Sequence, residues 1–316
     1  MSATQLHKLK SAITVSRRYF RMRAGLMFGL CAALGWGGYL AATRHAVAEG
    51  LTSNDLAFIR YTTAGIILGP WLLLHWRDRC SGLSLSRSLI LALLAGPPLV
   101  MLVAGGSRHA PFATGMLVEL AVLAVVGILL ATWWLGERLD AIRVAGLVAL
   151  TVRIIVVAGP VFLCCTSRSW MGVIMYAGAG CMFAAFVALV EKWQIEPLAA
   201  TAVVSVMSAC TFGPYYLGVD GLGRLSGVSL WLLGEQVVGQ GLIAGVVALT
   251  AFSLCVRLEG IVRAMLFPAL TPAAGVLFGS SLTGELPTIT QASFLALSAL
   301  GALFLLAASR QPRTMA

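Results

Sequence analysis

The feature that most constrains this chain is a series of apolar runs, each about 20 residues long, the length of helix that crosses a hydrocarbon core. The runs are continuous rather than alternating in polarity, which predicts helices and argues against a transmembrane barrel. We therefore expect an all-α, polytopic membrane protein with ten transmembrane helices. The ten runs lie at 24–45, 55–76, 88–107, 110–135, 141–160, 170–190, 198–218, 234–256, 262–284 and 288–308.

The composition agrees with a lipid-facing surface. Hydrophobic residues make up 59% of the 316 residues and charged residues only 11%, against about 25% in soluble domains. The net charge of +10 is spread over short connecting segments instead of one basic face, so membrane lipid is an expected partner and nucleic acid is not. The seven cysteines are odd in number and show no CxxC spacing, which predicts neither a disulfide framework nor a metal site.

The basic residues also predict an orientation. If all ten runs cross and the N-terminus is cytoplasmic, the inner segments hold 16 of the 22 Lys and Arg residues, the outer loops hold four, and Arg60 and Arg153 lie within spans. This positive-inside pattern predicts an inner (cell) membrane protein with both termini in the cytoplasm. Residues 1–23 are expected to be a basic tail, disordered or anchored on anionic lipid, and not a cleaved leader; residues 309–316 form a short C-terminal tail.

Two landmarks indicate an internal duplication. Gly136-Glu137 recurs 148 residues later as Gly284-Glu285, and the aromatic-small-small-aromatic stretch that starts at Trp36 recurs 147 residues later at Phe183. We therefore predict two five-helix repeats, at 24–160 and 170–308. An odd number of spans inverts the second copy, and inverted repeats of this kind place a substrate site near the midplane of the membrane.

Several stretches resemble a known family. They are "LGWGG" in the first run, "LAFIRY" in the second, the junction "LLATWWLGERLDAIRVAGLVAL", and "LFPALTPAAGVLFGSSLTGELPTITQ" near the C-terminus. Over about residues 24 to 308 the chain is similar to the two EamA-type modules of the drug/metabolite transporter superfamily. The resemblance implies a ten-helix exporter of small metabolites, amino acids or drugs.

Glu119 is the first candidate site residue, because it is the one ionisable side chain in the run from Ala110 to Leu135. A charge at mid-bilayer costs about 3 kcal/mol or more on insertion scales, so Glu119 should face protein or a wet cavity. Burial favours the neutral form of a carboxyl, which suits a group that takes up and releases a proton. The alternative is a structural hydrogen bond or ion pair with a neighbouring helix.

The second run supplies Arg60, which could attract a substrate carboxylate, pair with Glu119, or extend to the outer interface. Trp36 and Tyr39, with their repeat counterpart Phe183, are expected to line the cavity, although plain packing would explain them equally. Gln240, with Gln236, makes the eighth run a second candidate wall.

Small residues and prolines predict local geometry. Gly25, Gly29, Ala33, Gly37 and Ala41 form a small-xxx-small stripe along which another helix can approach closely. Prolines in the third and ninth runs remove backbone donors and predict kinks there. These prolines are Pro97, Pro98, Pro268 and Pro272.

The expected function is that of a secondary transporter of a small molecule, most simply an exporter working by alternating access, driven by proton antiport or by the substrate gradient. No phosphate-binding loop is present, which argues against ATP hydrolysis, and the scattered histidines indicate no metal or cofactor. The alternative is a non-transporting assembly or regulatory membrane protein that retains this fold. An enzyme would need two convergent ionisable groups, and the sequence places only Glu119 clearly at the centre of a span.

Overall fold

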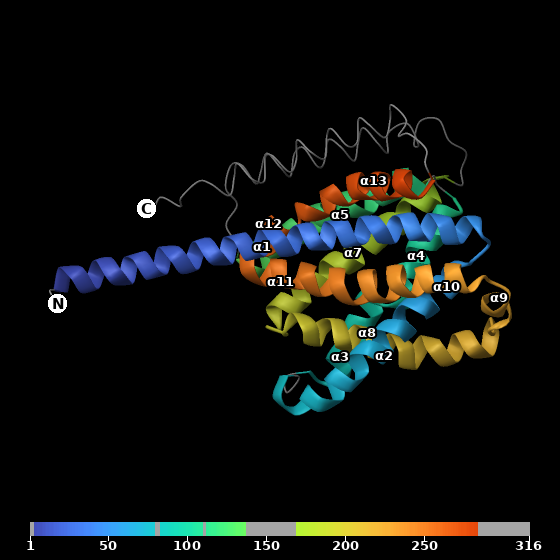
Figure 1. The fold of residues 1–316 in the computed structure, drawn as a ribbon, viewed down its shortest axis with the longest axis horizontal. Helices are drawn as coiled ribbons and strands as arrows, with labels where there is room; N and C mark the ends of the chain where they lie inside the picture. The colour runs from blue at the N-terminus through green and yellow to red at the C-terminus, as the bar shows by residue number, and fades with distance from the viewer. Residues whose placement is uncertain (1–2, 80–82, 110–111, 137–168, 284–316) are drawn as a thin grey trace.

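The computed structural model describes residues 3–79, 83–109, 112–136 and 169–283, which form helices and no strand (Figure 1). Within these ranges, seven helical segments are long and apolar enough to cross a membrane. This confirms the all-α, polytopic membrane fold. The predicted spans 141–160 and 288–308 lie outside the described residues, so the count of ten stays a prediction.

The described helices lie on either side of residues 137–168, which are outside the described ranges. The first half contains α1 (Ala3–Ala48), α2 (Ser53–Arg79), α3 (Leu85–Ala95), α4 (Pro97–Ser107) and α5 (Phe112–Leu135). The second half contains α7 (Ser169–Lys192), α8 (Pro197–Val219), α9 (Gly223–Ser226), α10 (Leu230–Gln236), the π-helix η1 (Val237–Ala248), α11 (Leu249–Glu259), α12 (Ile261–Ala264), the 3-10 turn η2 (Phe267–Leu270) and α13 (Thr271–Thr283).

The basic N-terminal tail is helical and not disordered, whereas its anchoring on anionic lipid stays a prediction. It is helical from Ala3 and continues into the first span, so α1 projects beyond the bundle (Figure 1). Residues 3–22 contain neither glycine nor proline, so no residue interrupts the hydrogen-bond ladder that enters the span.

The two proline-rich runs are interrupted as predicted. The third span breaks at Gly96, between α3 and α4, and the freed carbonyl of Ala95 accepts a hydrogen bond of 2.9 Å from the hydroxyl of Tyr61 on α2. The ninth span breaks at η2, which contains Pro268. A carbonyl without a partner in a bilayer costs several kcal/mol, so Tyr61 stabilises the break.

The small-residue stripe of α1 also packs closely, as predicted. A Cβ atom at Gly29 would overlap the ring of Phe267, and one at Gly37 would overlap Ala274. The helix α1 therefore lies directly against the ninth span, which belongs to the other half of the chain.

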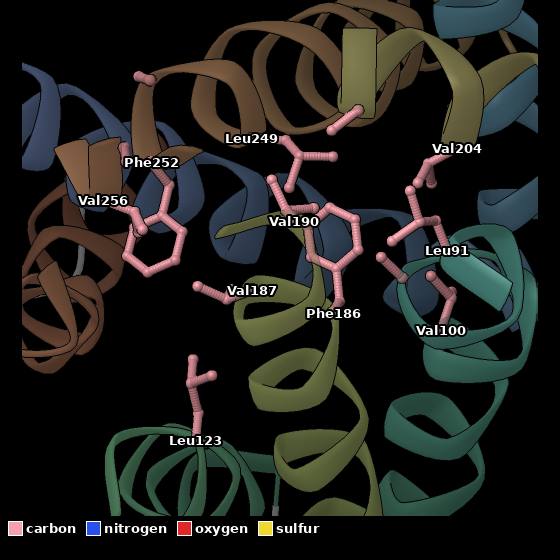
Figure 2. Packing of buried hydrophobic residues seen from close by; sticks show 14 of the residues in the cluster. Leu91, Val100, Leu123, Phe186, Val187, Val190, Val204, Leu249, Phe252 and Val256 are labelled. Carbon is pink, nitrogen blue, oxygen red and sulfur yellow. The ribbon is translucent and has the colours of Figure 1, made fainter. Parts of the chain in front are cut away.

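The two halves interlock around a shared apolar core. The helix α7 lies between α5, α4 and α11, and Figure 2 shows its Phe186, Val187 and Val190 facing Leu123 of α5 and Leu249 of α11. In turn α1 packs against η1, α11 and α13, and α2 packs along α8. Neither half encloses this core by itself.

A polar network joins α2 to α8 and α9 at one end of the bundle. The fully buried Asp55 carboxylate accepts hydrogen bonds from the Tyr216 hydroxyl and from Nε of Arg224, the latter at 3.2 Å. Arg224 also donates to Asp220 at 2.9 Å, and Asp220 accepts from Asn54. The charge of Asp55, helped by the bond to Asp220, raises the pKa of the Arg224 guanidinium above its usual value.

The outer face of the bundle is apolar. Leu73 and Leu74 on α2 are 83% and 79% exposed, and Trp133 and Trp231, near helix ends, are 97% and 81% exposed. Lipid-facing leucines with tryptophans near the ends of the helices are typical of a membrane-spanning surface.

Replacing Tyr61 with phenylalanine should lower the stability of the bundle. The change leaves the Ala95 carbonyl without its partner, which costs about 1–3 kcal/mol. The midpoint of thermal unfolding in detergent measures the loss. Tyr215→Phe, on an exposed ring of α8, is the matched control, and equal midpoints for the two variants would contradict this role of Tyr61.

Asp55→Asn should destabilise the protein more than Asp220→Asn. Asp55 is fully buried and accepts bonds from α8 and α9 as well as from Thr52, whereas Asp220 is partly exposed. We expect an excess loss of about 1–3 kcal/mol for Asp55→Asn in denaturant unfolding. Equal losses would show that the Asp55 network does not hold α2 to α8.

Candidate functional site

A cavity of about 70 Å³ lies inside the bundle, where helices of both halves meet. This is below the roughly 300–1,000 Å³ of sites for drug-sized ligands. Its walls come from α1, α2, α4, α5, α7 and the start of α13. The lining residues are Trp36, Tyr39, Leu40, Arg60, Leu99, Val100, Val103, Glu119, Leu120, Leu123, Phe183 and Thr271.

Five of the six candidate residues from the sequence meet in this cavity. They come from α1 (Trp36 and Tyr39), α2 (Arg60), α5 (Glu119) and α7 (Phe183). These residues are up to 147 positions apart in the chain, and the packing of α7 on α5, and of both α1 and α7 on α11, brings them together.

Arg60 points into the bundle and not to the outer interface. Its residue is 9% exposed, and its guanidinium carbon lies 5.3 Å from the centroid of the Tyr39 ring and 5.6 Å from that of Tyr61. Aromatic faces stabilise a desolvated cation. Its Nε atom is buried and has no hydrogen-bond partner among the described residues.

Glu119 is held in place by the tight packing of α5 on α7. A Cβ atom at Gly180 of α7 would lie 2.5 Å from the Glu119 backbone oxygen, so the two backbones are in direct contact. The Oε2 atom of Glu119 is buried without a partner in the described part of the chain, and no ion pair there joins Glu119 to Arg60.

Thr271, at the start of α13, supplies the third polar group of the cavity. Its Oγ1 is likewise buried without a partner among described residues. Thr271 was not among the residues predicted from the sequence. The adjacent Pro272 was the available signal, since a helix break can turn a hydroxyl away from its own backbone and into a cavity.

Aromatic rings form one wall of the cavity. The rings of Trp36 and Phe183 meet edge to face with centroids 5.7 Å apart, and both contact Phe252 of α11, at 5.1 and 5.9 Å. Such a wall offers apolar area and a π-face to a ligand.

Gln240 lies outside this cavity. It donates a hydrogen bond of 2.9 Å to Thr43 of α1, and Gln236 donates to the Ala42 carbonyl at 3.1 Å. The two glutamines therefore hydrogen-bond the second half to α1 at Ala42 and Thr43, which lie one turn after Tyr39. A hydrogen bond of 2.8 Å between Nδ1 of His45 and the Glu235 carboxylate extends this contact between α1 and the second half.

A second, larger hollow of about 990 Å³ lies between α1 and α10–η1. Its lining is almost wholly apolar, with Glu235 as its one ionisable residue, and includes exposed side chains such as Leu34 and Trp231. We regard it as part of the lipid-facing surface, because convergent polar groups are lacking. Among the described residues, no cluster of three or more His, Cys, Asp or Glu could hold a metal ion.

Comparison with known proteins agrees with this architecture. Residues 23–159 match the EamA-like transporter family. A solved structure titled only "Crystal structure of protein" superposes with a TM-score of 0.68 over 93% of this chain and 99% of its own, at 18% identity, which shows a shared fold. No curated protein matches the chain. This match covers less than half of the chain, and the similarity to that family supports a membrane transporter.

Proposed function

We propose that the protein is a secondary exporter of a small molecule, which it carries through the Arg60–Glu119 cavity by alternating access. The observation that carries the proposal is the set of three partnerless polar atoms, on Arg60, Glu119 and Thr271, that share one cavity inside an apolar bundle. Unpaired buried polar groups are costly in a membrane, and they mark sites that a ligand or ion completes.

The helix contacts support an inverted-repeat arrangement. With an offset of about 147 residues, α1 corresponds to α7 and α5 to the ninth span, so the contact of α5 with α7 matches that of α13 with α1. Likewise α2 corresponds to α8, and these two helices pack on each other. Trp36 and Phe183 correspond in the same way and touch, as residues beside a twofold axis would. Such symmetry provides two equivalent conformations, one open to each side.

In this proposal Glu119 couples transport to protons. The groups that face it are Arg60 on α2, Tyr39 on α1 and Tyr176 on α7, so it is the one carboxyl of the set. A carboxyl that alternates between the two sides of a membrane can gain and lose a proton in each cycle.

The non-transporting alternative is less favoured by this geometry. It predicts a Glu119 sealed against Arg60 or a hydroxyl, whereas Glu119 Oε2 has no partner among the described residues. Catalysis is also less favoured, although Arg60 and Glu119 converge. A guanidinium stays protonated in proteins and cannot serve as the acid–base partner of Glu119.

Metabolite profiling of cells with and without the gene tests the function, since an exporter should lower its substrate inside the cell and raise it outside. Release of that substrate from protein-containing vesicles is the direct confirmation. Identical profiles, together with no protein-dependent release of any solute, would contradict the proposal.

Glu119→Gln should abolish the pH dependence of transport while leaving the fold intact, since the amide is similar in shape but cannot exchange a proton. The measurement is transport in proteoliposomes under imposed pH gradients. Glu49→Gln, at an exposed loop carboxylate, is the control and should keep the normal pH profile. An unchanged profile for Glu119→Gln would show that coupling does not use this group.

A disulfide across the seam between α1 and η1 should stop transport reversibly. A Cβ atom at Gly239 would lie 3.0 Å from Cβ of Ala42, slightly less than the roughly 3.5–4.5 Å of a disulfide, so a small shift allows the bond. We expect the Ala42→Cys/Gly239→Cys variant to lose transport on oxidation and regain it on reduction. Each single variant is a control, and full transport by the cross-linked protein would contradict movement at this seam.

A further inference from the structure

A short segment between α8 and α10, residues 220–229, folds over the start of α2, and we call it the strap. Its helical part is α9, and Figure 1 shows α9 at the end of the bundle where α1 leads into α2. Gly221, near the beginning of the strap, has a φ of 68°, a left-handed conformation in which the chain turns away from α8. Leu225 is 9% exposed and belongs to the shared core, so the strap has an apolar anchor.

Polar contacts hold the strap to α2. Arg224 donates hydrogen bonds to the Asp55 carboxylate at 3.2 Å and to Asp220 at 2.9 Å. Asp220 in turn accepts a hydrogen bond of 2.9 Å from Asn54. Two residues of the strap therefore contact two consecutive residues at the start of α2, which lie more than 160 positions earlier in the chain.

The helix that the strap holds also carries Arg60 of the cavity. Arg60 follows Asp55 by five residues, which is about 7.5 Å along an α-helix. Between these two residues, the ring of Phe58 stacks on that of Tyr216 of α8, with centroids 4.3 Å apart. The strap and this ring pair therefore join α2 to α8 on one side of Arg60.

The positions that correspond to this network in the other half are apolar. With the offset of 147 residues, Asp55 corresponds to Ala202, and Tyr216 corresponds to Gly69. An inverted-repeat arrangement places these two residues at the opposite end of the contact between α2 and α8. The two conformations that the symmetry relates are therefore unequal, because one contains the Asp55 network and the other has no polar side chains at these two positions.

We propose that the strap is a latch, whose contacts with Asn54 and Asp55 keep this end of the bundle closed and favour the conformation in which the cavity opens at the opposite end. This inference rests on the proposed alternating access. The predicted orientation places the strap on the outer side of the membrane, so the favoured conformation is the one that takes up substrate from the cytoplasm. An interaction made in one conformation and lost in the other shifts the population between them.

The latch lies where water can replace its contacts. The Arg224 side chain is 46% exposed, whereas the Asp55 side chain is fully buried. When the strap lifts, water enters at the end of the bundle and hydrates the carboxylate, so opening does not leave a charge buried without a partner. The same ion pair near the middle of the membrane would have no water to replace it. The position of the network therefore allows it to form and break in each transport cycle.

Side-specific labelling of a cavity residue tests the latch. Val103, which lines the cavity, is replaced by cysteine in a chain without native cysteines and is labelled by a membrane-impermeant maleimide added to one side of oriented vesicles. Leu222→Cys, at an exposed position of the strap, identifies the side that carries the strap. We expect Arg224→Gln to raise the labelling rate of Val103→Cys from the strap side about tenfold, with no rise from the opposite side.

Matched variants distinguish a latch from a merely structural contact. Arg44→Gln removes a positive charge from an exposed position of α1 at the same end of the bundle and should leave both labelling rates unchanged. Arg224→Lys keeps the positive charge and should restore most of the slow labelling from the strap side. A structural role would instead raise the labelling from both sides together.

The outcomes separate this inference from the transport proposal. If Val103→Cys is labelled from both sides and Arg224→Gln changes neither rate, or raises both equally, the latch is overturned and the transport proposal stands. If one side or both give no labelling in every variant, the cavity does not open alternately, and both proposals are overturned.

Discussion

The constraint on which this structure depends is the lack of water in the hydrocarbon core, where a polar group must find a partner in the protein. The bundle meets this demand at several points where a helix is broken or crossed. The Tyr61 hydroxyl donates a hydrogen bond to the Ala95 carbonyl beside the break at Gly96, and Gln236 donates one to the Ala42 carbonyl of α1. Three of the five buried side-chain polar atoms that lack a partner among the described residues share the Arg60–Glu119 cavity.

The interlocked packing explains why these polar atoms come together. The glycines of α1 bring it against the ninth span, and Gly180 brings α7 against α5, so side chains from distant parts of the chain surround one small volume. The Asp55 network and the Gln240–Thr43 seam fasten the same halves at other points. A transporter needs both features, namely contacts between halves that can exchange and a site that lies between them.

Much of this could be predicted from the sequence, because the signals are local or periodic. The apolar runs predicted the spans, and Pro97 and Pro98 predicted the break in the third. The 147-residue offset indicated Phe183, the counterpart of Trp36, as a residue of the cavity wall. Glu119 stood out because it lies alone in an apolar run.

The remaining features depend on contacts between distant residues. The partners of Asp55 on α8 and α9 lie more than 160 positions away, which no local pattern reveals. The π-helix η1 likewise lies where glycines contact α1 and α2. Thr271 is one of many hydroxyls, and only the folded chain shows that it lacks a partner. The helix over residues 3–22 was not predicted, because the basic residues indicated a disordered or lipid-anchored tail. The absence of glycine and proline in this segment was the signal for a helix.

The central claim is that the space between Arg60 and Glu119 is open to water from each side of the membrane in turn. Leu120, which lines the cavity, can be replaced by cysteine in a chain whose seven native cysteines are removed. Labelling by a membrane-impermeant thiol reagent, added to either side of oriented vesicles, is the most direct measurement. The account predicts labelling from both sides and protection by substrate, whereas no labelling from either side would show a dry, sealed interior and contradict it.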